Sequence, residues 1–162
     1  MRFHGSIGLA LVLALLPAIA SAPTAADELG GPQAASVMAT LHQFVDGFNK
    51  GDAKSALAAC ATQASIIDEF PPHEWMGPTA CDQWAADYAA NAKRAGITDG
   101  IVTLGKPWHL SVNGDRAYVV VPATYTYKER GKPVTERDSI FTVALLKFAA
   151  GWRITGWAWS RH

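Results

Sequence analysis

The sequence predicts an α+β domain in which three N-terminal helices pack on one face of a curved antiparallel sheet. Apolar residues recur at helical intervals up to Gly96, and from there the period changes to the alternation of β-strands. Turn-forming residues then separate long strand-like segments. Helices followed by a run of hairpin-connected strands are typical of α+β folds.

Local signals give the bounds of the expected helices. Val37, Leu41 and Phe44 belong to the apolar face of the first helix, and Asp52 is a natural N-cap for a short second one. Pro78 stands where proline favours the start of a third helix. We therefore expect helices over 34–49, 52–60 and 78–96.

The strands are expected from alternation and turn residues. A first strand over 65–70 is ended by Pro71-Pro72, since proline cannot continue a ladder. Asn113-Gly114 is a strong hairpin turn between two of the later strands. The remaining strands are expected over 98–111, 116–129, 133–148 and 152–159.

Composition excludes several classes of function. Lys+Arg 14 balance Asp+Glu 14, so neither nucleic acid nor an anionic membrane is expected as a partner. The histidines lack metal-ligand spacing, and no Gly-x-Ser-x-Gly sequence is present. We expect no metal, no cofactor and no nucleophilic hydrolysis.

The N-terminus has the pattern of a secretory signal peptide. Arg2 supplies the positive charge, residues 7–16 form a short apolar run, and Ala20-Ser21-Ala22 fits the small-x-small cleavage rule. We expect residues 1–22 to be removed, 23–33 to form a flexible leader and 34–162 to form the domain. The mature protein would be periplasmic or secreted, without a membrane segment.

Export bears on the two cysteines. Cys60 and Cys81 each fall on the apolar face of a predicted helix, and they form the one possible pair. In an oxidising compartment they form either a disulfide or two buried thiols.

The order of elements, with Phe48-Asn49-Lys50-Gly51-Asp52 between the first two helices, resembles the nuclear-transport-factor-2-like superfamily. Its members include ketosteroid isomerases, SnoaL-type polyketide cyclases and scytalone dehydratase. The resemblance covers the chain from about Ala34 onward. It implies a cone in which helices and the concave sheet surround an apolar pocket, and a homodimer formed through the outer face of the sheet.

The resemblance also implies a role for Asp68. Its position after Gly51-Asp52 and before Gly77 matches the proton-shuttling aspartate of ketosteroid isomerases. Carboxylates are depleted in strands, and this one shares a face with Ile66, whereas Glu69 is expected to point the other way. Asp68 is the candidate general base. The alternative is a structural carboxylate that caps a turn or pairs with Arg153.

The oxyanion-hole donors of those isomerases have no equivalent here. Phe44 takes the place of their tyrosine, and Ala144 that of their protonated aspartate. Since such donors supply the largest catalytic contribution, ketosteroid isomerase activity itself is not expected. Asp138 is a weak candidate for the missing acid.

Strand and helix faces suggest which side chains line the pocket. Tyr125 and Tyr127 share one face, Asp138 shares one with Thr142, and Trp157 and Trp159 share one with Arg153 and Thr155. The expected lining residues are Phe44, Trp84, Tyr88, Tyr125, Tyr127, Thr142, Trp157 and Trp159. The alternative is that these aromatic residues only fill the core.

Three functions remain open. The chain is an exported protein that binds a small apolar or aromatic molecule, an acid–base isomerase, dehydratase or cyclase with Asp68 as base, or an interaction module with a filled cone. Fold-level analogy does not choose among them.

Overall fold

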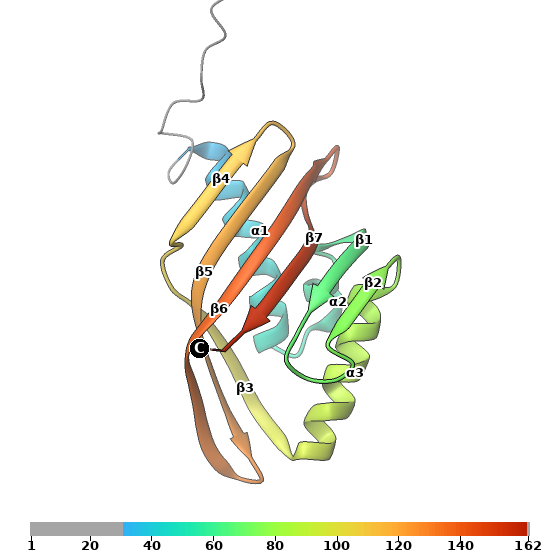
Figure 1. Ribbon diagram of the computed structural model, residues 1–162, viewed down its shortest axis with the longest axis vertical. Helices are drawn as coiled ribbons and strands as arrows, with labels where there is room; N and C mark the ends of the chain where they lie inside the picture. Colours follow the sequence, from blue (N-terminus) through green and yellow to red (C-terminus); the bar gives the residue numbers. More distant parts are fainter. Residues whose placement is uncertain (1–30, 162) are drawn as a thin grey trace, which may run out of the picture.

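The computed structural model describes residues 31–161, which form one curved sheet with helices on one face (Figure 1). The seven strands are β1 (Cys60–Ile67), β2 (Glu74–Gly77), β3 (Ile97–Leu104), β4 (His109–Asn113), β5 (Arg116–Glu129), β6 (Lys132–Phe148) and β7 (Gly151–Ser160). Their order is β2-β1-β7-β6-β5-β3, with β4 also paired to β5. The predicted signal peptide lies outside the described residues.

The sheet is mixed rather than purely antiparallel. β1 pairs with β7 in parallel, while its other neighbour, β2, is antiparallel to it. The parallel pair joins the first strand of the chain to the last one. The α+β class and the helices on one face of a curved sheet are confirmed.

The described part of the chain contains three helices, as predicted: α1 (Pro32–Asn49), α2 (Ala53–Leu57) and α3 (Ala80–Ala95). The Asp52 side chain accepts a hydrogen bond from the backbone N–H of Ser55 and caps α2, and Gly96 ends α3 with φ 71°. α1 begins within the predicted leader, so that leader does not extend to residue 33. The α2 helix ends before Cys60, which opens β1 instead.

Asn49 attaches the end of α1 to the sheet. Its side-chain amide donates a hydrogen bond to the carbonyl oxygen of Val102 (2.8 Å) and accepts one from the Val102 N–H (2.7 Å). At Gly47 a Cβ would lie 2.5 Å from a backbone nitrogen of α2, so glycine allows the two helices to touch. The Asn49 contact thus holds α1 against the sheet, and the Gly47 contact holds α2 against α1.

Several predicted strand bounds are corrected. The segment expected over 98–111 is divided into β3 and β4 by Gly105 and Pro107, and both parts pair with β5. The first strand ends at Ile67 rather than at residue 70. In the β4–β5 hairpin the two central residues are Gly114 and Asp115, because Asn113 pairs with Arg116.

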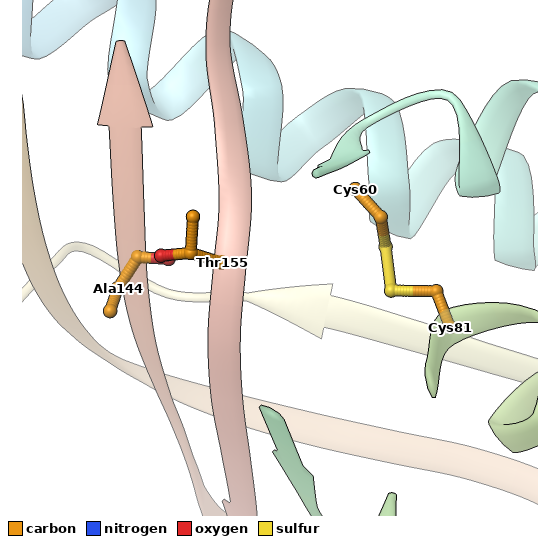
Figure 2. Close-up of a disulfide and its surroundings, with 4 residues drawn as sticks. All are labelled: Cys60, Cys81, Ala144 and Thr155. Atoms are coloured by element: carbon orange, nitrogen blue, oxygen red, sulfur yellow. A yellow bond between two sulfur atoms is a disulfide. The ribbon is translucent and has the colours of Figure 1, made fainter. Parts of the chain in front are cut away.

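A disulfide joins Cys60 at the start of β1 to Cys81 in the first turn of α3 (Figure 2). Of the two states expected for the cysteines, a disulfide or two buried thiols, the disulfide is confirmed. It ties α3 to the sheet on the side where α3 also contacts β2. Among the residues 31–161, no helix is long and apolar enough to cross a membrane.

Three strands each carry one extra residue relative to their partners. The register shifts between Thr98 and Ile101 in β3, between Glu136 and Ser139 in β6, and between Ile154 and Gly156 in β7. Such β-bulges turn the side chains that follow to the opposite face. They decide which residues reach the interior of the cone.

Candidate functional site

A cavity of about 220 Å³ lies between α1, α3 and the concave face of the sheet. Its walls are mainly aromatic, and the rings pack on one another: Trp84 and Trp157, for example, have centroids 4.9 Å apart. The aromatic residues that line it are Phe44, Phe48, Phe70, Trp84, Tyr88, Tyr125, Tyr127, Phe141, Trp157 and Trp159. An apolar cavity with a few polar groups is the usual form of a small-molecule site.

Asp68 is the buried acid of this cavity. It directly follows β1, and its backbone N–H donates to the carbonyl of His73 (3.1 Å), so the turn to β2 holds its position. Its residue surface is 9% exposed. Oδ2 accepts a hydrogen bond from Trp84 Nε1 (2.8 Å), and Oδ1 accepts one from the Glu69 backbone N–H (2.7 Å).

Burial raises the pKa of Asp68 from 3.8 to about 6, because the charged form loses its hydration. The two hydrogen bonds from Trp84 and Glu69 oppose this shift, while the negative charges of Glu69 and Glu136 add to it. A carboxylate with a pKa near neutrality can both take up and release a proton at physiological pH.

Two tyrosines provide hydroxyl groups inside the cavity. The hydroxyl of Tyr88 on α3 is hydrogen-bonded to that of Tyr125 on β5. Burial raises the pKa of both phenols, so both stay protonated. A Cβ at Gly100 would lie 2.8 Å from the Tyr125 hydroxyl, so the bulge in β3 leaves room for this pair. The pair can donate a hydrogen bond to a bound molecule.

A second acid, Glu136 on β6, lies in the same cavity. Its Oε1 accepts hydrogen bonds from the Tyr127 hydroxyl (2.9 Å) and from Arg161 Nη1 (3.1 Å). Arg161 also pairs with Glu69 at the cavity rim. Burial raises the pKa of Glu136, and burial together with the hydrogen bond to Glu136 raises that of Tyr127 to about 12.

Two polar atoms of the lining are buried without a hydrogen-bond partner among the described residues. They are Oε2 of Glu136 and Nε1 of Trp157. An unsatisfied buried polar group costs about 1–3 kcal/mol, and such groups mark places where a ligand can supply the missing partner. One atom accepts and the other donates, and both belong to residues that line the cavity.

Most of the predicted lining residues do line the cavity, but Asp138 and Thr142 do not. At the extra residue in β6, Asp138 has φ 62° and an exposed side chain, whereas Glu136, which strict alternation would place on the same face, lines the cavity. Beyond the bulge Phe141, not Thr142, faces the interior. The prediction that Asp138 supplies the missing acid is therefore wrong, because Asp138 does not line the cavity.

Other sequence-based expectations change for the same reason. Trp157 and Trp159 line the cavity without Arg153 and Thr155, because β7 carries its extra residue at Thr155. Arg153 donates to the carbonyl of Trp152, so it does not pair with Asp68. Glu69 also lies at the rim, since the strand has already ended and alternation no longer applies.

Sequence reasoning missed Glu136, Arg161, Phe48 and Phe141 as lining residues. Glu136 lay in a charged stretch that resembles an exposed hairpin tip, and no local signal marks the bulge beside it. In residues 31–161 no three His, Cys, Asp or Glu side chains gather as a metal site would require. A second hollow of about 600 Å³ lies between α1, α2, α3 and β3, and it holds no buried acid.

Comparisons with known proteins agree with this geometry. A family model described as a SnoaL-like domain matches residues 37–161. No curated protein matches the chain.

Solved structures with this fold come from distant proteins. A nuclear transport factor 2-like superfamily protein from Salmonella enterica is 16% identical, with a TM-score of 0.66, and 78% of this chain and 89% of that one are covered. A ketosteroid isomerase-like protein from Erwinia carotovora is 16% identical, with a TM-score of 0.63, and 80% of this chain and 96% of that one are covered. The CaMKII hub of S. rosetta is 20% identical, with a TM-score of 0.66, and 82% of this chain and 98% of that one are covered. At these identities the likeness concerns the fold alone.

Proposed function

The chain belongs to the SnoaL-like domain family, and we propose that its cavity binds a small apolar or aromatic molecule. The observation that carries this proposal is the cavity of about 220 Å³ with aromatic walls and a buried acid. A cavity of about 150 Å³ is enough for benzene, so this one has room for one ring with a short chain. The unpartnered buried atoms at its wall also favour an occupant.

Filling the cavity tests the proposal. Asn91 on α3 lines the cavity and is partly exposed, so an Asn91→Trp variant can project an indole into it without removing a core side chain. Gln83→Trp adds the same indole to the exposed face of α3 and serves as the control.

Calorimetric titration with small aromatic compounds is the measurement. We expect binding to the wild type and the control, and a loss of about tenfold or more in the Asn91→Trp variant. Equal affinities in all three proteins would place the binding outside the cavity. Absence of binding across a library of ring compounds, together with native mass spectrometry showing no retained ligand, would refute the proposal.

Asp68 favours a second candidate function, acid–base catalysis. Its carboxylate can accept a proton from a carbon next to a carbonyl group and return it elsewhere on the same molecule. In the Tyr88–Tyr125 pair one hydroxyl donates to the other, so the second is free to donate to the oxygen on which negative charge develops. This donor differs in position from those of ketosteroid isomerases.

An Asp68→Asn variant separates the two functions. An enzyme would lose turnover by at least about 100-fold while still binding the substrate. A binding protein would keep its affinity within a few-fold and show no turnover in either form. Retained turnover in the variant would exclude Asp68 as the base.

Export is part of the proposal. A disulfide between Cys60 and Cys81 is compatible with the periplasm or the extracellular space, where such bonds persist. Mass spectrometry of the N-terminus of the mature protein, purified from its native compartment, would test cleavage after Ala22. Native mass spectrometry of the same sample would test whether the protein is a homodimer, as expected from the resemblance.

A further inference from the structure

The first observation concerns the free oxygen of Glu136. The Glu136 side chain is 9% exposed, and its Oε2 has no hydrogen-bond partner among the described residues. The other oxygen already receives hydrogen bonds from Tyr127 and Arg161. A carboxylate oxygen only accepts, so the group that completes this site must carry an N–H or O–H donor.

The second observation is the charge of the cavity. Three acids line it, namely Asp68, Glu69 and Glu136, against one basic side chain, Arg161. The Arg161 side chain is 53% exposed at the rim, and its hydrogen bonds already go to Glu69 and Glu136. The cavity therefore carries an excess of negative charge, which attracts cations and repels anions.

The third observation is the position of the aromatic rings beside Glu136. Tyr125 lies opposite Glu136 in the register of β5 and β6, and its ring stacks on that of Tyr127 with centroids 4.7 Å apart. The faces of aromatic rings carry negative potential and attract ammonium groups. One wall of the cavity thus combines a free carboxylate oxygen with rings suited to a cation.

We propose that the cavity selects an organic cation, a protonated amine attached to a small aromatic or apolar body. The ammonium group pairs with the Glu136 carboxylate, and the body packs against the aromatic walls. This inference rests on the proposed function and names the chemical class of its ligand. The cavity of about 220 Å³ limits the body to one ring with a short chain.

Three compounds of nearly equal size and different charge test the inference. They are 2-phenylethylamine, neutral propylbenzene and anionic phenylacetate, each titrated at pH 7.5 and followed by ligand-observed NMR. We expect the amine to bind about tenfold tighter than propylbenzene, and the anion to bind more weakly than either. Propylbenzene or the anion binding as tightly as the amine would overturn the inference and leave the proposed function intact. Failure of all three to bind would overturn both.

A Glu136→Gln variant locates the selectivity. Glutamine keeps the size of the side chain and removes its charge, so the advantage of the amine over propylbenzene should fall to within about threefold. Glu74→Gln removes one exposed carboxylate outside the cavity and should keep the tenfold preference. An unchanged preference in the Glu136→Gln variant would show that Glu136 is not the group that recognises the amine.

Discussion

The titration of Asp68 should make the stability of the protein depend on pH. Replacing Asp68 by Asn should remove most of that dependence. The pKa of Asp68 is raised from 3.8 to about 6 in the folded state. Between these values the unfolded chain has released the proton that the folded protein still holds. The wild type therefore loses stability as the pH rises through this window, and the loss is complete above the folded pKa.

The size of the effect follows from the pKa shift. A shift of roughly two units corresponds to roughly 3 kcal/mol, of which about 2 kcal/mol falls between pH 4.5 and 7.5. An Asn side chain has one acceptor oxygen for the two donors, Trp84 Nε1–H and the Glu69 N–H, so it loses about 1 kcal/mol at every pH. The diagnostic quantity is thus the change in the stability difference between the two pH values.

Urea denaturation followed by far-UV circular dichroism at pH 4.5, 6 and 7.5 measures this difference. We expect the Asn variant to gain about 2 kcal/mol on the wild type over this range. Asp46→Asn, at an exposed site on α1, controls for the loss of one negative charge. A difference that stays constant, or moves in favour of the wild type as the pH rises, would refute the reasoning that burial raises the pKa of Asp68.

The other predictions concern stability. Reducing the bond between Cys60 and Cys81, which are 21 residues apart, should lower the unfolding free energy by roughly 3 kcal/mol; an unchanged urea midpoint in reductant would contradict this. Gly100→Ala should cost about 1–2 kcal/mol because its Cβ displaces the Tyr125 hydroxyl, so a melting temperature equal to that of the wild type would argue against the contact. Asp138→Val should cost about 1–2 kcal/mol at its φ of 62°, whereas Asp138→Gly should be tolerated, and equal melting temperatures for the two variants would exclude strain there.

The helices were largely predictable because their signals are local. The cap at Asp52 and the left-handed Gly96 lie where the sequence places them, and the apolar face of α1 is buried as expected. The parallel pairing of β1 with β7 was not predictable, since it joins segments far apart in the chain. Nothing in the composition of either strand identifies its partner.

The candidate site was predictable only in part. Asp68 directly follows β1, and Trp84 and Tyr88 lie on one face of α3; local patterns define both elements, and the structure places all three residues at the cavity. Glu136 and Arg161 depend instead on the register of the long final strands. Pairing Glu136 with Tyr127 requires the β5–β6 hairpin to be in place, which no local pattern describes.

The bulges explain why strict strand alternation assigns the wrong residues to the cavity. β3, β6 and β7 each carry one extra residue, and each reverses the face that a strict period of two assigns. Glycine marks two of these places, at Gly100 and Gly156, and a glycine inside a strand is a recognised sign of a bulge. The bulge in β6 has no such mark. A prediction that follows the pleat alone therefore puts Glu136, Asp138 and Thr142 on one face, whereas in the folded chain Glu136 lies at the cavity and Asp138 is exposed.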